Sequence, residues 1–121
     1  MAEELRVWGT RIEAQRCTQA GTRPIIVVSR DSINHNKIGN NRGLLIVGVP
    51  TTDAEHLAEL YPSHVKLRKG TGGLTKDSVA LCEQVGAISV DRLVSYMGGL
   101  SPDEMARIEN ALRIVLMLPR D

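Results

Sequence analysis

The chain has 121 residues, which is one ordinary domain with room for a substantial core. Its 42% hydrophobic and 24% charged residues are typical of a globular protein, and a net charge of +1 does not indicate a strongly basic nucleic-acid binder. With one Trp, two Tyr and no Phe, the chain is poorly equipped to stack successive bases, which argues against a general single-strand-binding protein.

Targeting and redox signals point to the cytoplasm. No apolar stretch is long enough to span a membrane, and the acidic start of the chain has no apolar region behind it, so we expect neither a signal peptide nor a membrane partner. Cys17 and Cys82 match no metal-ligand spacing and make no disulfide framework, which indicates reduced thiols. His35, His56 and His64 are too scattered in the sequence to predict a metal site or an acid-base pair.

The first half of the chain predicts strands and loops. Strands are expected at residues 6–12, 24–29 and 44–49, because these runs are short, rich in β-branched side chains and bounded by Pro, Gly or Asn. Residues 31–43 are rich in Asn, Ser and Gly and predict a long loop, with room for one helical turn after Asp31.

The second half predicts further strands followed by helices. Strands are expected at residues 65–67 and 78–84, and the several short strands with glycine-rich turns suggest a small barrel. Ser89 can cap a short helix over residues 90–96. Ser101 and Glu104 have capping-box spacing, with Pro102 at the first helical position. The helix that follows should pack an apolar face on the barrel; this face is formed by Met105, Ile108, Leu112, Val115 and Leu116.

Two polar side chains beside the predicted strands suggest a site. Arg23 directly precedes the strand at residues 24–29, and Thr52 follows the strand at residues 44–49. If these strands pair antiparallel, the guanidinium of Arg23 comes near the hydroxyl of Thr52. A fixed cation beside a hydroxyl suits a phosphodiester, because phosphoryl transfer needs donors aimed at oxygens that gain charge. The alternative for Arg23 is an ordinary surface residue or salt-bridge partner.

A series of short strings along the chain carries a family resemblance. In order, these strings are Arg23-Pro24-Ile25-Ile26-Val27-Val28-Ser29, Asp31-Ser32-Ile33-Asn34, Val49-Pro50-Thr51-Thr52, Tyr61-Pro62-Ser63-His64-Val65, Gly72-Gly73-Leu74, Asp77-Ser78-Val79-Ala80-Leu81-Cys82-Glu83-Gln84 and Leu100-Ser101-Pro102. The series resembles the MazF/PemK toxin endoribonucleases from about Val7 to Leu118. Each string alone is weak, but their order makes the resemblance specific.

The resemblance implies a fold and an activity. The fold would be α+β: a single domain over residues 1–121, built as a small SH3-like antiparallel β-barrel with appended short helices and a C-terminal helix. The activity would be metal-independent cleavage of single-stranded RNA at short sequence motifs, with attack by the RNA 2′-hydroxyl to give a 2′,3′-cyclic phosphate. Family members thereby stop translation, work as homodimers without a cofactor, and are silenced by a cognate antitoxin protein.

The resemblance also assigns roles to particular residues. Arg23 and Thr52 match the catalytic arginine and threonine of the family. Because Thr51 is adjacent to Thr52, the resemblance leaves the position of the catalytic threonine ambiguous by one residue, although strand alternation favours Thr52. Residues expected to bind the substrate are Thr18, Gln19, Thr51, Lys76, Glu83 and Gln84.

Structural alternatives stay open for several of these residues. The spacing of Thr52 and Glu55 fits a helix capping box. Glu83 and Gln84 can brace a loop through hydrogen bonds instead of reading base edges. Lys76 belongs to a basic cluster beside Gly72 and Gly73 that is either a solvated loop or a track for RNA phosphates.

The sequence departs from the family pattern in its loops. Residues 17–21 replace a Gly-Ser-Glu-Gln loop, Gly86 stands where relatives commonly carry arginine, and residues 37–42 lengthen the loop between two strands. These departures motivate a second hypothesis, a catalytically silent dimer that binds antitoxin or RNA. A gyrase-poisoning toxin of the CcdB type is disfavoured, because that function depends on a Trp-Gly-Ile terminus and this chain ends in Leu118-Pro119-Arg120-Asp121.

Overall fold

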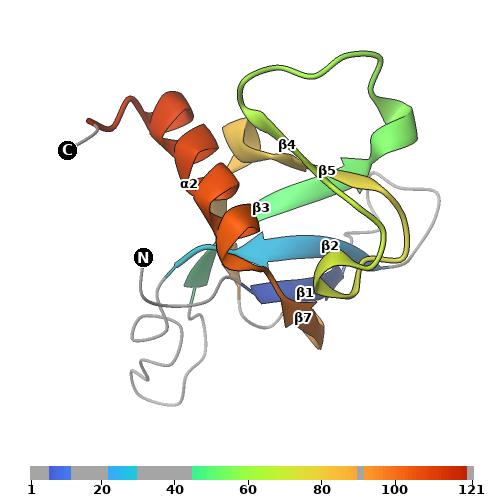
Figure 1. The fold of residues 1–121 in the computed structure, drawn as a ribbon. Helices are drawn as coiled ribbons and strands as arrows, with labels where there is room; N and C mark the ends of the chain where they lie inside the picture. Colours follow the sequence, from blue (N-terminus) through green and yellow to red (C-terminus); the bar gives the residue numbers. More distant parts are fainter. Residues whose placement is uncertain (1–5, 12–21, 30–44, 90–91, 120–121) are drawn as a thin grey trace.

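The computed structural model describes residues 6–11, 22–29, 45–89 and 92–119. It contains an antiparallel sheet with the strand order β4-β5-β3-β2-β1-β7, and β6 also pairs with β3 (Figure 1). The strands are β1 (Arg6–Arg11), β2 (Thr22–Val27), β3 (Leu45–Asp53), β4 (His64–Leu67), β5 (Ser78–Leu81), β6 (Gly86–Ser89) and β7 (Leu93–Gly99). Among the described residues, the short 3-10 helices η1 (Ala54–His56), η2 (Thr71–Gly73) and η3 (Cys82–Gln84) precede the helix α2 (Pro102–Leu116).

Strand β3 connects the two parts of the sheet. Its central residues pair with β2, with Ile25 opposite Pro50 and Val27 opposite Gly48. Its last three residues, 51–53, pair with β5, and its first four, 45–48, pair with β6. Because β3 continues through Pro50, it extends four residues beyond the predicted end at Val49. The residues that follow Pro50 therefore belong to the sheet and not to a loop.

The other strand predictions had mixed outcomes. The strands expected at residues 6–12, 24–29 and 65–67 are confirmed as β1, β2 and β4 within one or two residues, and residue 12 lies outside the described part. The strand expected at residues 78–84 ends at Leu81, where the chain turns into η3 and resumes as β6. The loop and helical turn expected over residues 31–43 also lie outside the described residues.

The helix predicted over residues 90–96 is wrong from Leu93 onward, and residues 90–91 lie outside the described part. Residues Leu93–Gly99 form β7, which pairs antiparallel with β1 and places Tyr96 opposite Trp8. Leu93, Val94 and Tyr96 are residues that suit a strand, and β1 offers an edge with unpaired backbone groups. Pairing with a distant strand overrode the local capping signal at Ser89.

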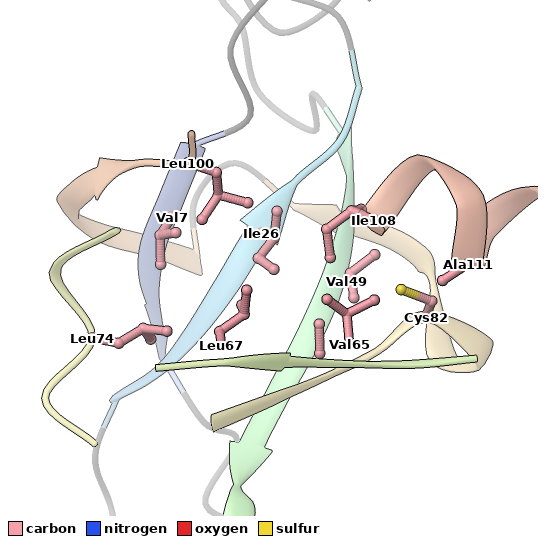
Figure 2. Close-up of a cluster of buried hydrophobic side chains, with 11 residues drawn as sticks. Val7, Ile26, Val49, Val65, Leu67, Leu74, Cys82, Leu100, Ile108 and Ala111 are labelled. Carbon is pink, nitrogen blue, oxygen red and sulfur yellow. The ribbon is translucent and has the colours of Figure 1, made fainter. Parts of the chain in front are cut away.

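The main core lies between the sheet and α2 (Figure 2). Its strand residues include Val7, Ile26, Val49 and Val65, which Figure 2 draws in one cluster with Ile108 and Ala111 of the helix. The helix begins as predicted: the Ser101 hydroxyl accepts from the Glu104 N–H at 3.2 Å, and the Glu104 carboxylate accepts from the Ser101 N–H at 2.7 Å. This reciprocal cap fixes where α2 starts and hence which face it presents to the sheet.

The described sheet is open. Its pairing order begins at β4 and ends at β7, and these two strands do not pair with each other within the described residues. An antiparallel sheet with a C-terminal helix is therefore confirmed, and hydrogen-bonded closure is not found in the described part of the chain. No described helix is long and apolar enough to cross a membrane.

The glycines of η2 permit close packing on β7. Gly73 has φ +79°, a left-handed conformation, and a Cβ there would overlap the carbonyl oxygen of Met97. Gly86 has only one atom near the corresponding Cβ position, the carbonyl oxygen of Gln84 at 3.9 Å, which is an ordinary contact. A Cβ atom is therefore sterically tolerated at Gly86 but not at Gly73.

We predict that Gly73→Ala destabilises the fold by about 1–3 kcal/mol, because alanine must adopt a left-handed backbone and displace β7. Gly86→Ala should change stability by less than about 0.5 kcal/mol. Urea denaturation of both variants checks this. Equal midpoints for the two variants would contradict the account of η2 packing.

Candidate active site

Arg23 and Thr52 flank the end of the β2–β3 pairing. The antiparallel pairing assumed from the sequence is present, and Ile25 lies opposite Pro50. The β2–β3 pairing ends at this pair, with Arg23 two residues before Ile25 and Thr52 two residues after Pro50. The Arg23 side chain is exposed and Thr52 is half-buried. A cation and a hydroxyl therefore flank the same end of the β2–β3 pairing, where β2 begins and β3 nears its end.

Thr51 holds this junction together. It is only 4% exposed, and its Oγ1 donates a hydrogen bond to the backbone oxygen of Pro24 at 2.9 Å. Neighbouring residues of a strand face opposite sides, so the side chain of Thr51 points away from that of Thr52. The Thr51 hydroxyl is committed to β2 directly beside Arg23, and Thr52 is the more accessible of the two threonines.

His56 is a neighbour of Thr52 that sequence reasoning missed. The Thr52 Oγ1 lies 3.4 Å from the His56 Nδ1, because η1 turns the chain back immediately after β3. The helix-capping alternative for Thr52 is not observed: Asp53 is the N-cap residue of η1, and no side chain caps it. The four-residue spacing of Thr52 and His56 was the available signal, but it depends on a turn that the sequence does not specify.

Lys76 lies on the same side of the molecule. Its Nζ is 3.4 Å from the Asp53 Oδ2, and its side chain is 71% exposed. An ion pair this exposed contributes little to stability, so the ammonium is available to another anion. A pocket of about 490 Å³ adjoins it, lined by Asp53, Ala54, Glu55, Lys69, Thr75, Lys76 and Asp77. The structure thus brings Arg23, Thr52 and Lys76 to one end of β3.

Glu83 is held by a separate network. The His64 Nδ1 accepts from the Tyr61 N–H at 3.1 Å, so Nε2 carries the proton and donates to the Glu83 Oε2 at 3.3 Å. Burial alone would raise the pKa of Glu83, but its own backbone N–H, the Ser63 hydroxyl and the His64 ring outweigh burial and lower that pKa. The result is a fixed, ionised carboxylate with a 40% exposed side chain.

Glu83 and Gln84 lie away from Thr52 in the folded chain. Val79 lies opposite Thr52, and Glu83 is four residues further along, beyond the end of β5. Gln84 is exposed in η3. The predicted site residues Thr18 and Gln19 lie outside the described residues. The described candidates therefore form two groups, one at each end of β5.

Cys82 lies between Glu83 and the core. It is fully buried, and Figure 2 shows its sulfur beside Ala111. Burial, and to a smaller degree the charge of Glu83, raises the pKa of this thiol to about 11. The thiol is therefore protonated at neutral pH and acts as a small apolar core residue.

The lowered pKa of Glu83 predicts a pH-dependent contribution to stability. A carboxyl with a lower pKa in the folded chain stabilises the fold above its unfolded pKa of about 4.3 and stops doing so as the pH falls through the folded value. Glu83→Gln should therefore lower the melting temperature at pH 7, and the difference should disappear in acid. Glu59→Gln, at an exposed position, serves as the control. A melting temperature of Glu83→Gln that matches wild type at pH 7 would contradict the network.

Comparison with known proteins identifies the family. A family profile described as "PemK-like, MazF-like toxin of type II toxin-antitoxin system" matches residues 5–116. Endoribonuclease MazF9 of Mycobacterium tuberculosis is 34% identical over 113 residues, covering 93% of each chain. Endoribonuclease MazF of Staphylococcus epidermidis is 33% identical over 104 residues, covering 86% of this chain and 81% of that protein.

The fold agrees with this relationship. The structure is similar to a mycobacterial endoribonuclease solved in complex with its cognate antitoxin, with a TM-score of 0.70 and 21% identity over 94% of this chain and 95% of the other. At that identity the likeness concerns the fold alone, while the sequence matches carry the relationship. The chain therefore belongs to the PemK-like, MazF-like toxins of type II toxin-antitoxin systems.

Proposed function

We propose that this chain is a metal-independent endoribonuclease that cleaves single-stranded RNA at short sequence motifs and thereby inhibits translation. The observation that supports the proposal is the end of the β2–β3 pairing: Arg23 precedes it on β2, Thr52 follows it on β3, and the Thr51 hydroxyl bonds to the Pro24 oxygen between them. The curated relatives named endoribonuclease support the reaction class. RNA brings its own nucleophile, the 2′-hydroxyl, so the protein must align the phosphate and stabilise charge.

In this proposal Arg23 stabilises the transition state. Attack of the 2′-oxygen on phosphorus forms a P–O bond, and the bond to the 5′-oxygen breaks. The products are a 2′,3′-cyclic phosphate and a 5′-hydroxyl end. Charge grows on the non-bridging oxygens meanwhile, and an exposed guanidinium can hold two of them at once.

Thr52 provides the hydroxyl group of the proposed site, and His56 lies beside it. Thr52 would donate its hydroxyl to the scissile phosphate, and Thr51 would keep β3 in register through its bond to Pro24. The His56 ring, 3.4 Å from the Thr52 oxygen, orients that hydroxyl and can accept or release a proton during the reaction. This assigns the catalytic threonine to Thr52 and a substrate-positioning role to Thr51.

Substrate recognition is divided between the two ends of β5. Lys76 would bind a phosphate of the chain next to the scissile one, since its ammonium is mostly exposed. Glu83 would accept hydrogen bonds from the amino group of a base, and Gln84 would contact a neighbouring base or sugar. Thr18 and Gln19 are proposed to complete the RNA site.

Partners and location follow the same proposal. We assign a cytoplasmic location, a homodimeric state and silencing by a cognate antitoxin, which is supported by the mycobacterial structure solved with its antitoxin. We also group the fold with the small SH3-like barrels, because β3 pairs with partners in both parts of a bent sheet. A catalytically silent dimer is the second candidate, motivated by Gly86 at a position where the family resemblance leads us to expect arginine.

Arg23→Ala should slow RNA cleavage by about 100-fold or more, the usual loss when one transition-state donor is removed. A long RNA of mixed sequence, incubated with chelator, gives the cut positions and the chemistry of the ends. Arg113→Ala, an exposed arginine on α2, is the matched control and should cleave like wild type. Intact RNA with folded wild-type protein would contradict the enzyme and favour the silent dimer.

Thr52→Ala and His56→Ala should each reduce cleavage, with Thr52→Ala the more severe because it removes the group that contacts the phosphate. Thr52→Ser keeps the hydroxyl and should retain most of the activity. Single-turnover rates over a range of pH separate the two roles. A His56→Ala profile of the same height and shape as wild type would remove His56 from the mechanism.

A further inference from the structure

The pocket of about 490 Å³ beside Lys76 begins one residue after Thr52. Its first wall is formed by Asp53, Ala54 and Glu55, where β3 runs into η1, and its second wall by the connection from β4 to β5. The volume is within the range of sites that hold small organic ligands. One strand residue spans about 3.3 Å, so an RNA strand bound at Thr52 has its next nucleotide within reach of this pocket.

Hydrogen bonds hold the two walls of the pocket together. The Asp77 backbone oxygen accepts from the Ala54 N–H at 3.0 Å, and the Asp77 Oδ1 accepts from the Lys69 N–H at 2.8 Å. The hydroxyl of Ser78, a buried residue, donates to the Lys76 backbone oxygen at 2.9 Å. The pocket is therefore preformed, and a ligand does not have to order its walls.

Side chains of both charges are available to a ligand in this pocket. Glu55 is exposed, and no hydrogen bond or ion pair connects its carboxylate to another residue in the described part of the chain. Lys69 and Lys76 are also exposed, and the pairing of Lys76 with Asp53 at 3.4 Å is weak in solvent. A matching ligand combines an anion for the lysines with hydrogen-bond donors for the carboxylate. A nucleotide of RNA has both, in its phosphate and in the edge of its base.

The carboxylate of Glu55 distinguishes among the four bases. A carboxylate accepts two parallel hydrogen bonds, as it does from arginine. Guanine has two adjacent donors on its Watson–Crick edge, N1–H and the 2-amino group. Adenine and cytosine each have one amino group beside a ring nitrogen that is an acceptor, and uracil has one N–H between two carbonyls. Guanine is therefore the base that satisfies both oxygens of the carboxylate.

We propose that this pocket is a guanosine subsite, in which Glu55 binds the Watson–Crick edge of a guanine while Lys69 and Lys76 bind the phosphate of the same nucleotide. The proposal rests on the proposed cleavage of RNA and adds a base preference to it, a guanosine next to the cleaved phosphate. Glu55 is then a specificity-determining residue, and Glu83 reads a different base at the other end of β5.

A substrate with one altered base tests the contact with Glu55. The cuts that the wild type makes in RNA of mixed sequence first locate the guanosine. Inosine at that position keeps N1–H but lacks the 2-amino group, so wild-type single-turnover cleavage should slow about tenfold. Glu55→Gln should cut the guanosine RNA about tenfold more slowly than wild type and should not distinguish inosine from guanosine. Glu59→Gln, at an exposed position outside the pocket, is the matched control and should discriminate like wild type.

A binding measurement separates this proposal from the proposed cleavage. Guanosine 5′-monophosphate, titrated into the full chain labelled with nitrogen-15, should shift the Glu55 and Lys76 amides, and adenosine 5′-monophosphate should shift them much less. Binding of the guanosine nucleotide without any RNA cleavage would contradict the enzyme and support the subsite.

Three results would overturn the subsite and leave the enzyme intact. The first is a set of cuts with no guanosine next to them. The second is equal binding of guanosine 5′-monophosphate by wild type and Glu55→Gln. The third is an equal shift of the same amides by inorganic phosphate alone, which would mean that the lysines bind any phosphate and that the base makes no contact.

Discussion

The fold depends on β3 changing partners at Pro50 and Thr51. Before this point the strand pairs with β2 and β6, and after it with β5. Proline supplies no N–H, which leaves one ladder bond out where the pairing changes. The Thr51 hydroxyl then donates to the Pro24 oxygen and ties the two strands together. This bond joins the two strands beside Arg23 and Thr52, because each neighbours one of its partners.

The elements around this junction were largely predictable from local patterns. Short β-branched runs gave β1, β2 and β4, and the Ser101–Glu104 spacing gave the start of α2 together with its cap. The prediction at residues 90–96 failed because a capping signal describes only its neighbours in sequence, whereas β7 exists through its pairing with the distant β1. The predicted β3 ended too early, at Val49, for a similar reason: proline is a signal that ends a strand, and the pairing of residues 51–53 with β5 depends on the fold.

The candidate site, like the fold, was predictable only in part from local sequence. The antiparallel pairing could be assumed from two neighbouring strands, and that assumption was enough to predict Arg23 near Thr52. The contact between Thr52 and His56 depends on the tight turn η1, which has no side-chain cap that would mark it in the sequence. Likewise, the tautomer of His64 follows from a bond to the Tyr61 N–H that only the folded turn creates. Residues fixed by strand register were accessible to sequence reasoning, and those fixed by turns were not.

The central claim is that Arg23 and Thr52 act on the same phosphate. A double-mutant cycle in RNA cleavage tests this directly, using single-turnover rates of wild type, Arg23→Ala, Thr52→Ala and the double variant. Groups that stabilise one transition state together give strongly non-additive losses, so the double variant should be little slower than Arg23→Ala alone. Losses that multiply across the two substitutions would mean that the residues act at separate places, and this would contradict the site described for the β2–β3 junction.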